Sequence, residues 1–484
     1  MTSILEELKA SGKTGVFIGG DWVECAEELP VVDPASEEVL VGVGLAEAAH
    51  AENAVVAAFD ASKPWALTPP RERGEILRRT FEAMRAREED LAELIVLENG
   101  KAYPDALGEV RYAAEFFRWF SEEASRVSGE LRMAPAGDKR IMTFRQPVGV
   151  SVMVTPWNFP AAMATRKLGP ALAAGCTAIV KPASDAPLTT LAIVHLMEQA
   201  GLPPGVVNIV VAKGSSGVIE NMLRDPRVRK LSFTGSTEVG RTLLKVASDQ
   251  VLRVSMELGG NAPFLVFDDA NLGAALEGAM VAKMRNAGEA CTAANRFLVH
   301  AAVADEFTSM LAGAMGSLKM GPGIDRSNQV GPMINERSRD DIAKLVQTAV
   351  DDGAKVVVGA SVPDRRGYFY EPTVLSGVAA DSEILQQEIF GPVAPVVTFE
   401  TDEEAIALAN DTVYGLAAYL YSGDLARGLR AAEAIEAGMV GVNRGLVSDP
   451  AAPFGGVKHS GVGREGSHEG MDEYLETKYI AVNW

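Results

Sequence analysis

One cysteine, Cys291, lies in a setting suited to nucleophilic chemistry. It falls in the stretch Gly288-Glu289-Ala290-Cys291-Thr292, which follows a helix-like segment. A lone cysteine is usually a small buried apolar residue, but these polar, glycine-containing surroundings favour a loop thiol that can act as a nucleophile. The other cysteines, Cys25 and Cys176, lack such surroundings, and three cysteines so far apart cannot form a disulfide framework.

Two further residues carry groups suited to catalysis. Glu257 ends an apolar run, where a carboxylate is costly to bury unless it has a role or a partner. Burial raises a glutamate pKa into the range of a general base, although a salt-bridged structural glutamate is an equally good interpretation. Asn158, bracketed by Pro156 and Pro160, can donate to an oxyanion. Capping of the following helix is its more common role.

Two loops have residues suited to phosphate or sugar groups. The loop Lys181-Pro182-Ala183-Ser184 offers an ammonium and a hydroxyl, although a solvent-facing lysine explains it equally well. In the second loop, Gly235 allows a tight turn and Ser236 opens a helix whose N-terminus can bind an anion. Its glycine spacing is GxxxxG rather than the GxGxxG dinucleotide fingerprint, and Gly-Ser-Thr is also an ordinary helix cap.

These loops follow short apolar runs that predict strands. Helix-like segments separate the first five of six runs, and the starts of those five fall about 25 residues apart, the rhythm of a parallel sheet with helices on its faces. Ligands of such sheets bind beyond the carboxyl ends of the strands. The runs are Val148–Val154, Thr177–Val180, Val206–Val211, Arg229–Phe233, Arg253–Leu258 and Phe264–Phe267.

The rest of the chain predicts three further parts. Residues 70–126 are helical in pattern, and residues 129–146 predict a hairpin suited to assembly. A second α/β unit of about 180 residues follows residue 268. The tail Tyr474–Val482 predicts an isolated strand that pairs with the hairpin.

The composition restricts the possible partners. The 484 residues carry a net charge of −20, with no basic run, so we expect no nucleic acid and no anionic membrane as partner. The N-terminus does not resemble a signal peptide and no apolar stretch would span a bilayer, which makes the cytoplasm the expected location. The five histidines lack metal-ligand spacing. An anionic substrate must therefore be recognised locally, against the overall charge.

The motifs in their order closely resemble those of the aldehyde dehydrogenase superfamily. The Trp157-Asn158 turn, the Lys181 loop, Gly235-Ser236, Glu257-Leu258-Gly259-Gly260 and the Cys291 loop are followed by two more motifs. These are Glu388-Ile389-Phe390-Gly391-Pro392 and Pro453-Phe454-Gly455-Gly456. The resemblance runs from about residue 15 to the C-terminus. It implies an α/β fold with two Rossmann-like parallel-sheet domains and a small β oligomerisation element.

The resemblance also implies a mechanism. Cys291 adds to the aldehyde to give a thiohemiacetal, hydride leaves to a nicotinamide, and a thioester remains. Glu257 activates the hydrolytic water, while Asn158 and the backbone N–H of Cys291 share the oxyanion. No metal is needed.

The family pattern places a cofactor against a defined set of residues. Glu388 would hold the nicotinamide ribose. Ser184 replaces a glutamate that many NAD-preferring members carry, and Lys181 could pair with a 2′-phosphate, which favours NADP. The neighbouring Asp185 could oppose that phosphate, so NAD stays possible. The expected cofactor residues are Trp157, Lys181, Ser184, Gly235, Ser236, Leu258, Glu388 and Phe390.

The substrate is suggested by a resemblance to the succinate-semialdehyde dehydrogenases. Arg166, Arg285 and Ser448 fall where that subfamily binds the substrate carboxylate, although each arginine alone is more commonly a solvated helix residue. Glutarate semialdehyde or another ω-carboxy aldehyde is an alternative, because one methylene changes binding by only about 1–3 kcal/mol. Glu289 stands where many relatives have glutamine, and we expect its carboxylate to point away from Cys291.

The resemblance divides the chain into three parts. Residues 1–128 and 147–258 would form the dinucleotide-binding domain, and residues 259–452 the catalytic domain. Residues 129–146 and 470–484 would form the oligomerisation element of a homodimer or homotetramer. Other readings are an acyl-transferring dehydrogenase that uses CoA or phosphate in place of water, and an inactive relative with a structural or binding role.

Overall fold

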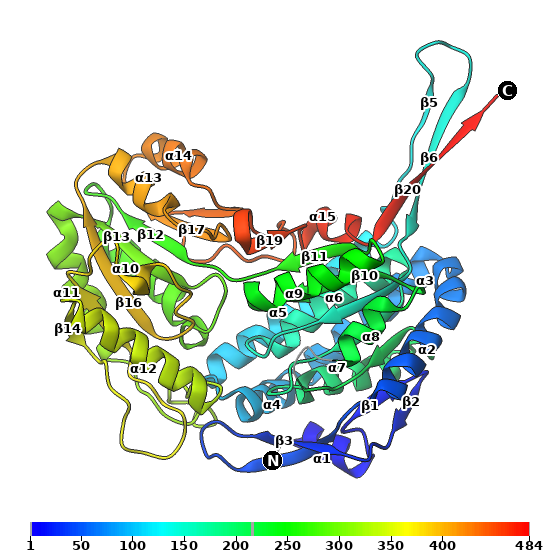
Figure 1. Ribbon diagram of the computed structural model, residues 1–484, viewed down its shortest axis with the longest axis horizontal. Coiled ribbons are helices and arrows are strands. Elements are labelled where there is room, and N and C mark those ends of the chain that lie inside the picture. The colour runs from blue at the N-terminus through cyan, green and yellow to red at the C-terminus, as the bar shows by residue number, and fades with distance from the viewer. Residues whose placement is uncertain (1, 214–216, 484) are drawn as a thin grey trace.

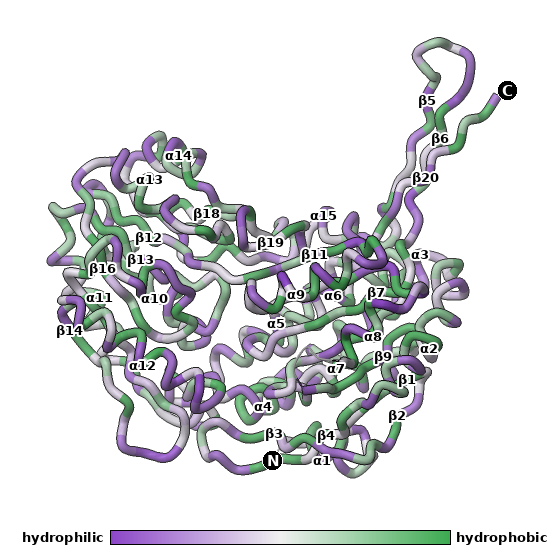
Figure 2. The backbone as a smooth tube through the Cα atoms, viewed as in Figure 1, coloured by the Kyte–Doolittle hydropathy of each residue, from purple (hydrophilic) through white to green (hydrophobic). Residues whose placement is uncertain are grey.

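Two sheets with helices on their faces and one projecting arm make up the computed structural model (Figure 1). The structure describes residues 2–213 and 217–483. The strands at the centre of both lobes are mostly apolar (Figure 2), because helices cover both faces of each sheet. Among the described residues, no helix has both the length and the apolar character that crossing a bilayer requires.

The first sheet confirms the predicted parallel core. Its strand order is β19-β11-β10-β7-β8-β9-β1-β2, and the five strands from β11 to β9 run parallel. These five correspond to the first five predicted runs. Antiparallel strands close both edges. The strands are β1 (Val16–Ile18), β2 (Asp21–Val23), β7 (Val150–Val154), β8 (Ala178–Lys181), β9 (Val207–Ile209), β10 (Val228–Thr234), β11 (Arg253–Glu257) and β19 (Gly461–Val462).

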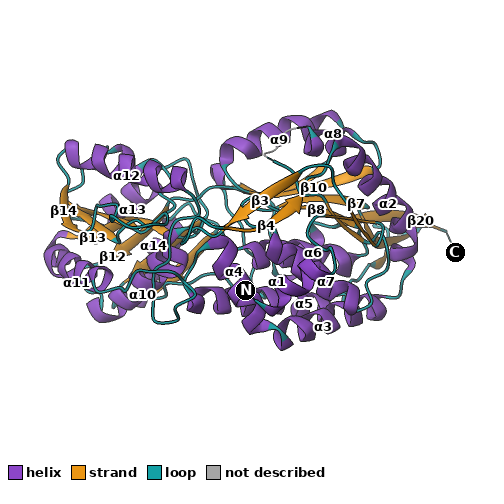
Figure 3. Cartoon of the chain, turned by 90° about the horizontal axis from the view of Figure 1, so that it is seen from below, coloured by secondary structure: helices purple, strands orange, loops and turns teal. Residues whose placement is uncertain are grey.

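Helices cover this sheet on both faces (Figure 3). One face packs against α2 (Ala48–Leu67), α8 (Val218–Arg224) and α9 (Thr237–Asp249). The other face packs against a thicker helical layer, inside which every residue of α6 is buried. That layer holds α1 (Ser3–Ala10), α3 (Pro70–Ala86), α4 (Glu88–Asn99), α5 (Tyr103–Glu123), α6 (Pro160–Ala174) and α7 (Leu188–Gln199).

The sixth predicted run opens the second sheet. Only residues 258–261 separate β11 from β12, which leaves no helix to return the chain to the first sheet. The order of the second sheet is β14-β15-β16-β13-β12-β17-β18, parallel except at the β14 edge. Its strands are β12 (Ala262–Val266), β13 (Ala294–His300), β14 (Lys355–Val358), β15 (Thr373–Ser376), β16 (Val393–Phe399), β17 (Ala417–Tyr421) and β18 (Met439–Val442).

The helices of the second lobe also divide between the two faces of their sheet. One face packs against α10 (Leu272–Met284) and α11 (Ala304–Gly316). The other packs against α12 (Glu336–Asp351), α13 (Asp402–Asn410) and α14 (Leu425–Ala434). This arrangement confirms the predicted second α/β unit.

A three-stranded sheet forms the arm that projects from the first lobe (Figure 1). It contains β5 (Leu131–Met133), β6 (Arg140–Pro147) and β20 (Leu475–Val482). β20 pairs antiparallel with β6 over the whole length of both strands. The predicted pairing of the tail with the hairpin is therefore confirmed. Near the start of the chain, β3 (Glu28–Val32) and β4 (Val39–Gly44) form a separate two-stranded sheet, and α15 (Ser467–Asp472) precedes β20.

A buried ion pair holds the turn between β7 and α6. Lys101 Nζ lies 2.6 Å from Glu109 Oε2 and donates to the Asn158 carbonyl at 2.7 Å. The other Glu109 oxygen accepts from the Ala161 and Ala162 N–H groups at 2.8 and 3.2 Å. The pair therefore satisfies the free amides at the start of α6 and fixes the backbone of Asn158.

Removal of Glu109 tests the importance of this pair. Glu109→Ala leaves a buried, unpaired lysine, so we expect a loss of about 3–5 kcal/mol in the free energy of unfolding. The control, Glu88→Ala, removes an ion pair to the exposed Arg111 and should cost under about 1 kcal/mol. The melting temperatures of the two variants give the comparison, and equal losses would contradict the role of the pair.

Candidate active site

A cavity of about 230 Å³ gathers most of the predicted catalytic and cofactor residues at the carboxyl ends of β7, β10 and β11. The strands are parallel and in register, with Val154 opposite Phe233 and Thr234 opposite Glu257, so the residues after them share one edge. The predicted residues that line it are Trp157, Asn158, Gly235, Ser236, Glu257, Leu258, Cys291, Glu388 and Phe390. Pro156, Met163, Thr234 and Gly259 complete the lining.

Cys291 is half-buried on the loop between α10 and β13. The loop leaves α10 through Asn286 and Ala287, which have φ of 54° and 50°, and Gly288, with φ of 78°. A Cβ on Gly260 would lie 2.1 Å from the Cys291 carbonyl oxygen, so only glycine lets these two segments approach so closely. Burial raises the pKa of the thiol to about 12, as do the charges of Glu388 and Glu257, against the lowering effect of Arg166 and Arg285. Cys291 therefore needs a base before it can attack.

Asn158 does not cap α6, so that interpretation of the sequence is wrong. Its Nδ2 donates to the Glu289 carbonyl at 3.0 Å, and Glu109 satisfies the first amides of the helix instead. The amide is buried beside the cavity. Because an amide nitrogen has two N–H groups, the second one is available to a substrate oxygen.

Glu257 is buried at the end of β11 with a strongly raised pKa. Burial is the main cause and the charge of Glu465 adds to it, whereas Arg166 and Lys167 act in the opposite direction. Neither carboxylate oxygen of Glu257 has a hydrogen bond from the described residues. The salt-bridged structural interpretation is therefore wrong, and the carboxylate is free to accept a proton from a bound molecule.

Arg166 is buried, 2% exposed, rather than solvated. Its Nε lies 2.7 Å from Glu465 Oε2 and forms an ion pair with it. The Nε–H bond is not aligned for a hydrogen bond to that oxygen. The guanidinium stacks 3.9 Å from the centre of the Phe454 ring. Its Nη2 has no hydrogen-bond partner among the described residues. A buried guanidinium with an unused donor is prepared for a negatively charged ligand.

Glu465 was not predicted as a site residue. Lys167 Nζ lies 2.6 Å from Glu465 Oε1, so Glu465 joins two adjacent cations of α6. These charges lower the pKa of Glu465, although burial opposes them. No local signal marks this role, because the contact spans about 300 residues of sequence.

Arg285 and Ser448, the other two predicted substrate residues, are half-buried and lie outside the cavity lining. The Arg285 guanidinium lies 5.2 Å from the centre of the Phe159 ring. Arg166 and Arg285 both act on the Cys291 thiol and on the hydroxyl of Tyr112, beside which Ser448 lies. The three predicted substrate residues therefore all lie within electrostatic or hydrogen-bonding reach of Tyr112, a residue that the sequence did not single out.

The residues predicted to bind a nucleotide lie along the same strand ends. Lys181, at the end of β8, is buried, and burial lowers its pKa to about 8 against the effect of Asp185. Ser184 Oγ donates to Asp185 Oδ2 at 3.4 Å. Ser236 caps α9 as predicted, accepting from the Val239 N–H. A lysine, a hydroxyl and a free helix N-terminus at one sheet edge fit a dinucleotide.

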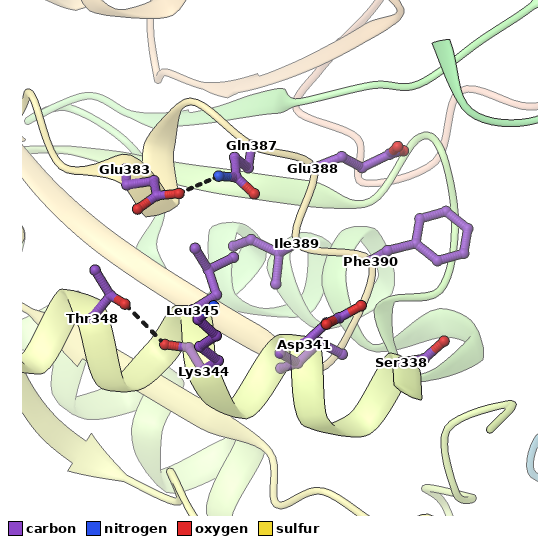
Figure 4. Close-up of a pocket in the computed structure, with 11 residues that line it drawn as sticks. Ser338, Asp341, Lys344, Leu345, Thr348, Glu383, Gln387, Glu388, Ile389 and Phe390 are labelled. Atoms are coloured by element: carbon purple, nitrogen blue, oxygen red, sulfur yellow. Dashed lines mark hydrogen bonds between the residues drawn. The ribbon is translucent and has the colours of Figure 1, made fainter. Parts of the chain in front are cut away.

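Glu388 and Phe390 lie where this cavity meets a second one of about 590 Å³ (Figure 4). Glu388 Oε1 accepts from the Gly260 N–H at 3.1 Å, and burial raises the pKa of Glu388 to about 7. A Cβ on Gly259 would lie 2.8 Å from Glu388 Oε2. Phe390 meets Trp157 edge to face at 5.4 Å. Phe390 and Trp157 thus form an apolar wall beside a carboxylate, which suits a nicotinamide and its ribose.

The carboxylate of Glu289 is bound to the segment that precedes α12. Its Oε1 accepts from the Ile334 N–H at 3.2 Å, and burial raises its pKa to about 8. Its backbone carbonyl accepts from Asn158 and Asn286. Glu289 therefore helps to hold the loop through its backbone, while its side chain anchors the segment before α12.

Comparisons with known proteins identify the family of this chain. The sequence model of the aldehyde dehydrogenase family matches residues 22–480. A succinate-semialdehyde dehydrogenase of Paenarthrobacter nicotinovorans is 56% identical over 444 residues, covering 92% of this chain and 99% of that protein. The succinate-semialdehyde dehydrogenase (NADP(+)) GabD of Escherichia coli strain K12 is 46% identical, covering 96% of this chain and 97% of that protein.

A solved structure gives the same result for the fold. The crystal structure of succinate-semialdehyde dehydrogenase from Burkholderia pseudomallei superposes with a TM-score of 0.95 at 46% identity, covering 96% of this chain and 97% of that one. The family match over most of the chain and these near full-length similarities show that the chain belongs to the aldehyde dehydrogenase family of NAD(P)-dependent oxidoreductases.

Proposed function

We propose that this enzyme oxidises succinate semialdehyde to succinate with NADP as the hydride acceptor. The observation that carries the proposal is the buried Arg166 guanidinium, whose Nη2 has no hydrogen-bond partner among the described residues, in a protein of net charge −20. A cationic pocket next to the nucleophile selects an aldehyde with a carboxylate at its far end. The names of the similar enzymes support the same substrate.

Cys291, Asn158 and Glu257 carry the chemistry. The Cys291 sulfur adds to the aldehyde carbon and its proton leaves to a base, which gives a thiohemiacetal. Asn158 Nδ2 and the Cys291 backbone N–H hold the oxygen as negative charge develops on it. A bound nicotinamide supplies the hydride acceptor, and a thioester on Cys291 remains. Glu257 then takes a proton from water, which attacks the thioester and releases the acid and the thiol.

The strand ends of the first sheet would hold the cofactor. Lys181 and Ser184 would meet the 2′-phosphate, the N-terminus of α9 the pyrophosphate, and Glu388 the nicotinamide ribose. Gly235 keeps the entrance to α9 open, since a Cβ there would lie 2.6 Å from the Phe233 ring. Apart from β19, the first sheet would belong to the dinucleotide-binding domain, residues 1–128 and 147–258, and the second sheet to the catalytic domain, residues 259–452.

The arm, residues 129–146 and 470–484, would join subunits into a homodimer or homotetramer. It projects away from both lobes (Figure 1) and exposes several large apolar side chains on its three strands. Such residues on a protruding sheet are typical of an association surface. They are Leu131, Met133, Phe144, Tyr479 and Ile480.

The catalytic roles are separable by variants and by pH. Cys291→Ala should abolish hydride transfer, whereas Glu257→Gln should keep a first burst of NADPH and slow turnover about 10²–10⁴-fold. Glu257 must be ionised to accept a proton, so its raised pKa predicts turnover that increases with pH above the ordinary glutamate range. Stopped-flow absorbance across pH gives both quantities. This division of roles would be contradicted if turnover of Glu257→Gln still increased with pH, or if the variant lost the first burst of NADPH.

The cofactor preference depends on Ser184. Ser184→Glu places a carboxylate where a 2′-phosphate would bind, so the ratio of kcat/KM for NADP to that for NAD should fall at least tenfold. Ser184→Ala, which adds no charge, should keep the direction of the preference. An unchanged ratio in Ser184→Glu would mean that another residue, such as Asp185, controls the choice.

The carboxylate pocket predicts a selectivity for succinate semialdehyde over butanal. Arg285→Ala removes a charge-assisted contact worth about 1.5–3 kcal/mol, so the ratio of the two kcat/KM values should fall about 10- to 100-fold. Arg326→Ala is the control, because Arg326 also stacks on an aromatic ring but lies on the exposed surface. A wild-type ratio near one would overturn the proposed substrate.

Succinate as the product, rather than a thioester or acyl phosphate, would exclude the acyl-transferring alternative.

A further inference from the structure

Tyr112 lies on the face of α5 that packs against α6. Glu109, three residues earlier, bonds to the first amides of α6, and Phe116, four residues later, lies 5.5 Å from the Arg166 guanidinium. Residues at these spacings share one side of a helix. Tyr112 therefore lies on the side of α5 that reaches the start of α6 through Glu109 and the Arg166 guanidinium through Phe116.

The ring of Tyr112 is held in place, but its hydroxyl is unused. Tyr112 meets Phe116 edge to face, with ring centres 5.0 Å apart. The hydroxyl oxygen is buried and has no well-aligned hydrogen bond within the described part of the chain, although the Ser448 side chain lies beside it. A buried phenol normally has a partner, because leaving its hydroxyl unpaired costs free energy. The Tyr112 hydroxyl therefore keeps a donor that a ligand atom could accept.

The surroundings identify the charge of that ligand. Burial raises the pKa of Tyr112, and the positive charges of Arg166 and Arg285 both act against it. The phenol therefore stays neutral and can donate at neutral pH. The groups near the Tyr112 hydroxyl are mainly hydrogen-bond donors. The two guanidinium groups can only donate, and the serine and phenol hydroxyls can each donate one hydrogen bond. Such a set matches a carboxylate, whose two oxygens accept about four hydrogen bonds.

We propose that the Tyr112 hydroxyl donates a hydrogen bond to the distal carboxylate of the substrate and is a specificity-determining residue of this enzyme. The inference rests on the proposed function, because it requires a substrate with a carboxylate in the Arg166–Arg285–Ser448 pocket. The bond is equally available to substrate and transition state, since the carboxylate does not react. Its loss should therefore raise KM and leave kcat nearly unchanged.

Tyr112→Phe removes the hydroxyl and keeps the ring against Phe116. We expect kcat/KM for succinate semialdehyde to fall about 10- to 100-fold, mainly through KM, with butanal unaffected. The inhibition constant of succinate should rise by a similar factor. Tyr103→Phe is the matched control: Tyr103 lies on the same helix, and its hydroxyl is also buried and unpaired, but it neighbours Arg326 instead of the pocket. It should change neither substrate's kinetics.

The outcomes separate the inference from the proposed function. If the wild-type enzyme does not prefer succinate semialdehyde, both are overturned. If the wild type has the preference and Tyr112→Phe keeps it, Tyr112 does not contact the carboxylate, while the arginine pocket stands. Equal losses for succinate semialdehyde and butanal in Tyr112→Phe would make Tyr112 a packing residue and would also overturn the inference.

Discussion

The cost of burying charge is the constraint on which this site depends. Arg166 lies inside the layer of helices beneath the first sheet, where an unpaired guanidinium would be strongly unfavourable. Glu465 makes its burial possible by pairing with both Arg166 and Lys167. The pairing is incomplete, since one nitrogen of Arg166 has no partner among the described residues. The fold thus maintains a buried positive charge that a substrate carboxylate can complete.

The same constraint explains the state of the catalytic groups. Glu257, Glu388 and Cys291 are all enclosed near one another, and enclosure raises the pKa of each. A thiol with a pKa of about 12 is unreactive in the absence of a base. Reactivity therefore depends on a base that takes the thiol proton and on Arg166 and Arg285, whose charges favour the thiolate. Substrate binding and nucleophile activation use the same electrostatic field.

Much of the fold and the site was accessible from sequence because the signals are local. Apolar runs at regular spacing predicted the first parallel sheet, the family resemblance implied the second, and the ends of the strands indicated Asn158, Ser236 and Glu257. The tail strand was found in the same way. The roles of Glu465, Lys101, Glu109 and Tyr112 were not accessible, because each depends on a contact between helices or segments far apart in the chain. Local capping rules also misassigned Asn158, since the helix amides are satisfied by Glu109 from another helix.

The central claim is that the substrate binds with its carboxylate in the Arg166–Arg285–Ser448 pocket and its aldehyde at Cys291. A crystal structure of the Cys291→Ala enzyme with succinate semialdehyde tests it most directly. The account predicts the carboxylate oxygens within hydrogen-bonding distance of both arginines, and the aldehyde oxygen facing Asn158 Nδ2 beside residue 291. A carboxylate that lies elsewhere, with both arginines unbound to it, would contradict the account.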